Sequence, residues 1–232
     1  MKLSEIKVTA AAYLHRKDYE MTVNGVDLAL VALNQVREQA EQNNDFNFTR
    51  RTFDVPVDGV SGGSLDPSVK TVIDVGVKDQ NGNLRPVEWT TTADALNQQR
   101  QENRFVTPRY PPDGTAYFNG QRFIFAGSHV DLFPKSPNLT VNLGVEAYTF
   151  TPDWTASDVD PLNATPYSGP WTERGHMYLL WSIVVHLNQL WRDFVFRQEG
   201  NLQPPEKLAE SALATLLTWD TFQYEQFRRH NR

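Results

Sequence analysis

The sequence predicts an α+β protein, in which helices from both ends of the chain form a helical bundle and a central antiparallel β-sandwich or barrel-like region is inserted between them. Three observations support this prediction. Apolar residues recur at helical spacing near the N-terminus, alternate with period two through the centre, and return to helical spacing near the C-terminus. We therefore expect N-terminal helices over 1–50 that pack with a C-terminal helical hairpin over 175–232. A β domain over 51–150 and a long connecting loop over 151–174 complete the prediction.

The N-terminal region is predicted to contain two helices. Ser4 can cap the first, because a serine hydroxyl accepts a hydrogen bond from a first-turn N–H group. Asn24 and Asp27 stand before the second helix. Its apolar stripe is predicted to consist of Ala29, Leu33, Val36 and Ala40. Its opposite, polar face would carry Asn34, Arg37, Glu38 and Glu41.

The central region is predicted to be a set of antiparallel strands. Alternating apolar positions run through 53–57, 69–77 and 139–145. Asn81-Gly82 and Asn119-Gly120 are expected to form type I′ hairpin turns, which require two residues with positive φ. A short polar helix is predicted over 92–104.

The first C-terminal helix is apolar around nearly its whole circumference. A polar strip interrupts it at Ser182, His186, Gln189 and Asp193. Because a small domain rarely surrounds a helix so completely, we expect part of this surface to meet a neighbouring subunit. Arg228, Arg229 and Arg232 follow the second helix's aromatic residues and suit its negative C-terminal end.

Composition excludes several functions. The 232-residue chain is 40% hydrophobic, so it can bury a core, and its net charge of -6 argues against a phosphate-gripping surface. It has no cysteine, which excludes thiolate metal sites and is typical of an intracellular protein. No signal-peptide core or membrane-spanning stretch is expected.

Catalytic chemistry is not predicted. The histidines are scattered, and we expect no metal, no cofactor and no enzyme activity. Asp153, Asp158 and Asp160 could bind a divalent cation or supply an acid/base pair, but loop aspartates near a proline more often form turns. Three tryptophans could stack on sugars or peptides, although such residues are more often buried anchors. They are Trp89, Trp154 and Trp171.

Four segments and the β-rich centre resemble tailed-bacteriophage virion proteins, more narrowly the head-to-tail adaptors, also called connector or neck proteins. The segments are Ala32–Glu41, Tyr178–Asn188, Arg197–Lys207 and Thr218–Asp220. The resemblance implies a homo-oligomeric ring, a dodecamer, assembled in the host cytoplasm into the virion, with the portal protein and a downstream neck or tail protein as partners. DNA would pass through the ring without specific binding, and an acidic lumen would suit this passage.

Two surfaces are expected to serve such an assembly. An aromatic and basic tail on an acidic chain suits docking onto an acidic partner, for which the portal is the natural candidate. It comprises Phe222, Tyr224, Phe227, Arg228, Arg229 and Arg232. The subunit interface or lumen would comprise Ser182, His186, Gln189, Asp193, Asp153, Asp158 and Asp160. The alternative function is a β-sandwich binding module for carbohydrate or protein on a host surface, and a hydrolase using the loop aspartates comes third.

Overall fold

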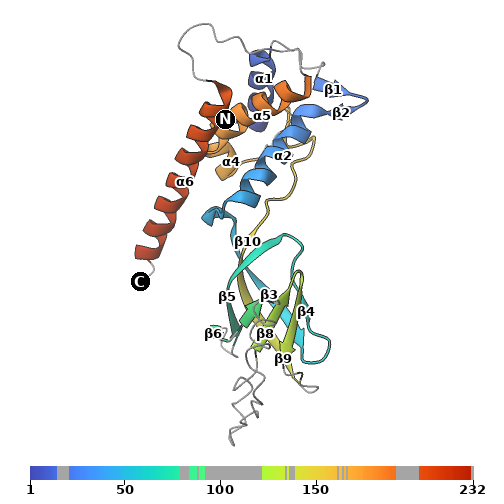
Figure 1. Cartoon of the computed structure of the whole chain (residues 1–232), viewed down its shortest axis with the longest axis vertical. Coiled ribbons are helices and arrows are strands. Elements are labelled where there is room, and N and C mark those ends of the chain that lie inside the picture. The colour runs from blue at the N-terminus through green and yellow to red at the C-terminus, as the bar shows by residue number, and fades with distance from the viewer. Residues whose placement is uncertain are drawn as a thin grey trace, which may run out of the picture. The chain divides into compact units, whose positions relative to one another are not determined.

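The protein has mixed α+β architecture, which confirms the predicted fold class (Figure 1). The structure is a computed structural model that describes residues 1–14, 21–78, 84–87, 89–91, 122–133, 135, 139–160, 162–163, 165, 167–191 and 204–230. It divides into two compact units. The helical unit comprises Met1–Phe48 and Thr151–Arg232, and the strand unit comprises Thr49–Phe150. The chain thus passes from the helical unit into the strand unit after Phe48 and returns at Thr151.

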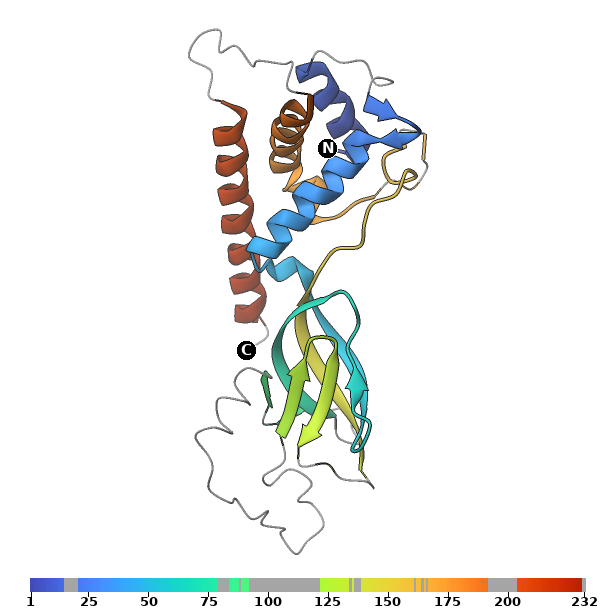
Figure 2. The ribbon, with the colours of Figure 1, turned by 45° about the vertical axis from the view of Figure 1, so that its right-hand side comes forward.

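One helix forms the centre of the helical unit. Its helices are α1 (Leu3–Tyr13), α2 (Leu28–Asn43), α4 (Pro170–Glu173), α5 (His176–Trp191) and α6 (Pro205–His230). Helix α5 packs against the other four (Figure 2). Its side chains Leu179, Ile183 and Leu187 are fully buried. Helices of the same chain therefore cover a large part of the described apolar surface of α5, while Met177 is exposed and Trp181 is half-buried.

The starts of the first two helices differ in how they are capped. In α1, the side chain of Glu5 accepts a 2.9 Å hydrogen bond from the backbone N–H of Lys2. Ser4 lies inside the first turn and is buried, so the prediction that it caps the helix is wrong. Asp27 caps α2, because its carboxylate accepts hydrogen bonds from the N–H groups of Ala29 and Leu30 at 3.0 and 3.2 Å.

A short hairpin precedes α2. Its strands are β1 (Thr22–Val23) and β2 (Val26–Asp27), which pair antiparallel with Val23 opposite Val26. Asn24 and Gly25 have φ values of 51° and 79°, as a type I′ turn requires. Sequence analysis interpreted Asn24 only as a residue in front of the helix. The Asn-Gly turns predicted at 81–82 and 119–120 lie outside the described residues.

Gly25→Val is expected to destabilise the helical unit by roughly 1–3 kcal/mol, because a β-branched residue is strained at positive φ. A Cβ at Gly25 would meet no atom within 4 Å, so the loss would come from the backbone alone. Gly25→Asn is the matched control, because asparagine tolerates this conformation. Urea unfolding checks the prediction: equal midpoints for the two variants would contradict the turn assignment.

The strand unit is a sandwich of two four-stranded sheets. The first has the order β3 (Arg50–Asp58), β10 (Thr140–Thr149), β5 (Val69–Lys78), β6 (Leu84–Pro86), and all of its pairs are antiparallel. The second has the order β4 (Gly63–Ser64), β9 (His129–Phe133), β8 (Arg122–Ala126), β7 (Trp89–Thr91). Side chains from both sheets, including Val57, Leu143, Phe123 and Val130, form one core.

One strand pair corrects the prediction of an antiparallel region throughout. Strands β7 and β8 are parallel, with Trp89 opposite Phe123. Residues 92–121 connect them, and a parallel pair needs a crossover of at least about a dozen residues, which this segment exceeds. The polar helix predicted over 92–104 falls in this segment, outside the described residues.

A tight turn that sequence analysis missed joins β8 to β9. Ala126 pairs with His129, so Gly127-Ser128 is a two-residue loop, and Gly127 has a φ of 61°. Glycine at the first loop position is typical of a type II′ hairpin. The sequence contains a pattern that predicts this hairpin, because Gly-Ser separates two runs in which apolar residues alternate.

Candidate functional site: buried charges that hold the crossing segments

A buried carboxylate holds the segment by which the chain re-enters the helical unit. Glu41, in the last turn of α2, is only 2% exposed. It accepts hydrogen bonds from the backbone N–H of Thr151 at 2.9 Å, from the Thr151 hydroxyl, and from the Trp171 indole N–H at 3.0 Å. These donors satisfy a charge that would otherwise be costly to bury.

Arg37 lies one turn before Glu41 on the same buried face of α2. Its Nη2 is 2.6 Å from an Asp153 carboxylate oxygen, and its Nη1 donates to the carbonyl of Pro152. Its guanidinium also lies 5.0 Å from the ring centroid of Trp154. Arg37 therefore holds the two residues that follow Thr151. Sequence analysis placed Arg37 and Glu41 on the solvent side of α2, and that prediction is wrong.

Asn34, a further turn back on α2, extends the same contact. Its side-chain amide donates to the Trp154 carbonyl and accepts from the Trp154 N–H, both at 2.9 Å. Backbone groups that a sheet or helix would normally satisfy are thus paired by α2 side chains. The re-entering segment is fixed to α2 at four consecutive residues, Thr151 to Trp154.

A second buried carboxylate holds the segment by which the chain leaves the helical unit. Asp220 of α6 is buried and accepts three hydrogen bonds. They come from the Asn47 N–H at 2.6 Å, the Asn47 side-chain amide at 3.0 Å, and the Phe48 N–H at 3.0 Å. Asn47 and Phe48 begin the 3-10 helix Asn47–Thr49, so Asp220 caps that helix from another element.

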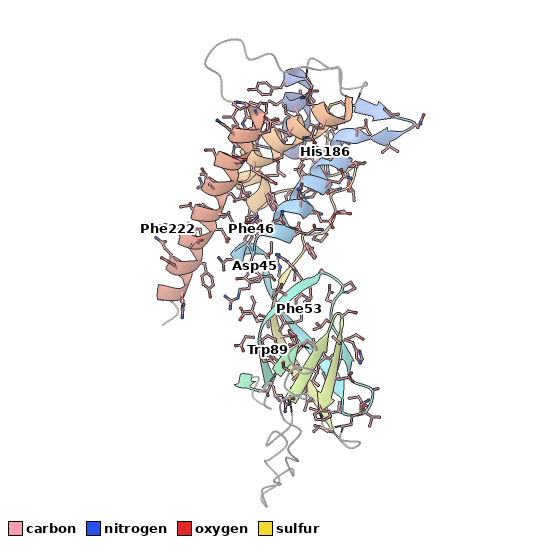
Figure 3. The ribbon with its side chains drawn as sticks, viewed as in Figure 1. Asp45, Phe46, Phe53, Trp89, His186 and Phe222 are labelled. Atoms are coloured by element: carbon pink, nitrogen blue, oxygen red, sulfur yellow. The ribbon has the colours of Figure 1, made fainter. Side chains whose placement is uncertain are left out.

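Trp171 connects the two anchored segments. Its fully buried ring makes edge contacts with Phe46 and Phe48, at centroid distances of 5.2 and 5.6 Å. Its indole N–H reaches Glu41, which holds Thr151. One side chain thus contacts the leaving segment through its ring and the re-entering segment through a carboxylate. Phe46 lies at the end of α2 in Figure 3.

The three loop aspartates form turns and structural pairs. The Asp153 side chain is 77% exposed and pairs with Arg37. Asp158 accepts from the Thr155 N–H at 2.7 Å and its hydroxyl at 2.8 Å, and Asp160 accepts from the Leu162 N–H at 2.8 Å. These bonds are typical of turn formation. Over the described part of the chain, no group of three or more His, Asp or Glu residues could hold a metal ion.

The predicted polar strip of α5 is partly accounted for within the chain. Ser182 is half-buried, and the nearby Tyr178 hydroxyl donates to the Val36 carbonyl at 3.2 Å. Burial raises the pKa of Tyr178 above its usual value. His186 of α5 is half-buried (Figure 3). Gln189 is exposed. Asp193 lies outside the described residues.

The predicted docking tail is described only in part. Phe222 is 55% exposed and lies on the side of α6 that faces away from the other helices (Figure 3). Tyr224 is half-buried and Arg228 is exposed. The side chains of Phe227, Arg229 and Arg232 lie outside the described residues. Phe222 and Arg228 are therefore the members of this surface that the structure places in reach of a partner.

Two of the three candidate stacking tryptophans are unavailable to a ligand. Trp171 is fully buried, and Trp154 is buried with its ring against Tyr167 at 5.3 Å. Trp89 is half-buried and makes an edge contact with Phe125 at 5.7 Å. The prediction that Trp154 or Trp171 forms a stacking platform is wrong, because both belong to the core of the helical unit.

His176 gives the helical unit a pH dependence. Burial, reinforced by the positively charged N-terminal amino group, lowers the pKa of His176 below its usual 6.5. Unfolding therefore takes up a proton at pH values between the lowered pKa and 6.5, so the free energy of unfolding falls as the pH drops below 6.5. Above 6.5 this contribution is fully present.

We expect His176→Gln to flatten that pH dependence. The measurement is urea unfolding of both proteins at about pH 7.5 and about pH 5.5, where histidine changes charge. The wild type should lose more stability than the variant between the two values. Equal losses in wild type and His176→Gln would contradict the assignment.

Comparison with known proteins identifies no relative. No protein-family model matches this chain, and the search of curated proteins finds no match. Within the described residues, the helices are each too short or too polar to cross a bilayer.

Proposed function

We propose that this chain is a non-enzymatic structural protein of a tailed-bacteriophage virion, a head-to-tail adaptor. Copies would form a ring, a dodecamer, under the portal, through which DNA passes toward the tail. One observation carries the proposal furthest: the strand unit is inserted between helices from both chain ends, and both crossing segments are fixed by buried charges. That layout supports the resemblance to connector proteins.

The hydrogen bonds and ion pair that the carboxylates make within the chain support a structural role for them. Glu41 and Asp220 each accept three hydrogen bonds from their own chain, and Asp153 is paired with Arg37. A general base or nucleophile must reach a substrate, whereas Glu41 and Asp220 are buried. These groups are instead committed to holding the backbone. The net charge of -6 suits a lumen along which DNA slides without specific binding.

The structure disfavours the competing functions. A carbohydrate-binding sandwich would need exposed aromatic rings, yet Trp154 and Trp171 are core residues of the helical unit. A hydrolase using the loop aspartates would need two carboxyl groups directed at one substrate. Asp158 and Asp160 instead accept hydrogen bonds from neighbouring loop residues. Of the three tryptophans considered for the binding-module alternative, the half-buried Trp89 is the one that lies in the strand unit.

The test is assembly with a portal ring. We expect the purified chain, mixed with portal protein of the same phage, to form a ring visible by electron microscopy and of dodecameric mass by native mass spectrometry. Deleting 227–232 should leave the thermal stability unchanged and abolish attachment to DNA-filled heads, because basic residues suit an acidic partner. A chain that binds no portal, and whose absence leaves tail attachment intact, would overturn the proposal.

A further inference from the structure

The outer face of α6 is exposed along the length that the structure describes. On the inner face, Leu213, Leu217 and Trp219 pack against the core of the helical unit beside the fully buried Leu216, so the helix is held firmly in place. The outer face repeats every seven residues, at positions 207, 214, 221 and 228 and at positions 211, 218 and 225, and these side chains are all exposed. Two interleaved series with this repeat give the spacing by which one helix packs along another.

The centre of this outer face carries no charge. Between Ser211 and Tyr224 the sequence has one charged residue, Asp220, and it is buried in the helical unit. Phe222, at the margin of the face, is more than half exposed and points away from the other helices (Figure 3). A helix face that stays in water is normally rich in charged and polar residues. The uncharged centre and the exposed aromatic ring therefore favour a partner protein on this face.

Three threonines on or beside this face can be buried at low cost. The hydroxyls of Thr215, Thr218 and Thr221 donate to backbone carbonyls four residues earlier, at 2.9, 2.8 and 2.9 Å. A hydroxyl donor that already has an acceptor loses no hydrogen bond when a partner displaces water. Together with Ser211 and Ala214, these small side chains also allow a second helix to approach closely.

Charges at the two ends of the face decide which partner fits. Glu206 and Lys207 lie near the start of α6, and all of its described end charges, including Glu225 and Arg228, are exposed. When two α6 helices run antiparallel, Lys207 of one copy lies opposite Glu225 of the other. In the same register, Glu206 of one copy lies beside Arg228 of the other. A parallel pair would instead place each charged residue next to its own copy, which is repulsive.

We propose that the outer face of α6 is a self-association surface, onto which a second copy of this chain docks with its own α6 antiparallel. The two faces are identical, so a two-fold axis relates the copies and each contact occurs twice. Near the axis, Ala214 faces Thr218 of the second copy, and further out Phe222 lies beside Ser211 of the second copy. Small side chains meet in the centre, and opposite charges meet at both ends.

This pairing goes beyond the proposed function and does not rest on it. A ring is built from head-to-tail contacts between unlike surfaces, whereas the α6 pairing is a two-fold contact between like surfaces. The dimer is therefore a state of the free chain. Phe222 and Arg228 also belong to the predicted docking tail, so a chain paired through α6 would have to separate before that tail reached a portal.

Cysteine cross-linking of the full chain tests the pairing and its direction. The chain has no cysteine, so every disulfide reports an introduced residue. Ala214→Cys and Thr218→Cys proteins, mixed in equal amounts and oxidised, should give the mixed 214–218 dimer well above the half expected at random. Same-residue pairs would be displaced by about 6 Å along the helix axis in addition to the gap between the helices, which exceeds the reach of a disulfide.

The cross-linking control is Gln35→Cys, an exposed position on α2, which should form disulfide dimers only at background level. The proposal is overturned if same-residue dimers predominate in the mixture, because that outcome indicates a parallel pair. It is also overturned if the two α6 variants cross-link no more than Gln35→Cys.

Exchange of charges, measured by sedimentation equilibrium, gives an independent readout. We expect the wild-type chain to dimerise as its concentration rises, and Lys207→Glu to weaken the dimer about tenfold, because two carboxylates then lie opposite each other. Adding Glu225→Lys to the same chain should restore the wild-type dissociation constant. Glu38→Lys, an exposed charge reversal on α2, should leave it unchanged. Thermal melts followed by circular dichroism check that each variant is folded.

Two results of the sedimentation experiment would contradict the pairing. One is a wild-type chain that stays monomeric at every concentration reached. The other is a folded double variant, carrying Lys207→Glu and Glu225→Lys, that dimerises no better than Lys207→Glu alone.

Discussion

Trp171→Ala is expected to lower the free energy of unfolding of the helical unit by roughly 3–5 kcal/mol, the usual loss for removing a buried tryptophan. The ring is fully buried, contacts Phe46 and Phe48, and donates to Glu41. The variant would leave a cavity between the leaving and re-entering segments and remove one of Glu41's three donors. Both effects lower the free energy of unfolding.

Trp171→Phe divides this loss into its two parts. Phenylalanine can keep ring contacts with Phe46 and Phe48 but has no N–H group for Glu41. We expect a loss of about 1–3 kcal/mol, typical of leaving one buried polar group unsatisfied. Urea unfolding followed by far-UV circular dichroism measures both variants. A Trp171→Ala protein as stable as the wild type would show that the ring does not join the two segments.

Glu41→Ala is expected to cost the helical unit about 3–5 kcal/mol, as when one partner of a buried charge network is removed. The substitution leaves the Thr151 N–H and the Trp171 indole N–H without their acceptor. It also removes the carboxylate 4.0 Å from Nε of the buried Arg37. We further expect faster amide exchange at Thr151, because that N–H loses its partner.

Two controls make this prediction specific. Glu38→Ala removes an exposed glutamate from the same helix, whose carboxylate accepts a 3.1 Å hydrogen bond from the Gln42 side chain, so it should change stability by at most about 0.5 kcal/mol. Glu41→Gln keeps the shape of the side chain and one acceptor oxygen, and its loss should be smaller than that of Glu41→Ala. If Glu38→Ala and Glu41→Ala cost the same, the buried network does not contribute to stability.

Local patterns determined the fold class and several element ends. The 3.6-residue spacing in the terminal regions and the alternation in the centre reflect which face of an element is buried, and this information lies within a few residues. The cap at Asp27 follows from the same kind of local chemistry, because its acceptors are the next residues of the helix. The Gly-Ser turn at 127–128 depends on equally local chemistry, although it was not among the predicted turns.

Tertiary structure alone decided the buried charges. Polar residues opposite the apolar stripe of an amphipathic helix normally face solvent. The amphipathic pattern therefore predicted that the side chains of Arg37 and Glu41 are exposed. Their partners Thr151, Asp153 and Trp171 come from more than a hundred residues away along the chain. Asp220 likewise meets Asn47 from the far end of the sequence.

The physical reason is that the free-energy cost of burying a charge is offset only when hydrogen-bond donors from distant parts of the chain bind to it. Propensity and periodicity predict how each segment behaves when its polar side chains are in contact with water. Glu41 is stable in the core because three hydrogen-bond donors from the protein replace water. The parallel pairing of β7 with β8 depends in the same way on a long crossover and on the sheet that receives it. The sequence therefore predicted the α+β class and the regions in which helices and strands alternate, and long-range packing decided which charged residues hold them together.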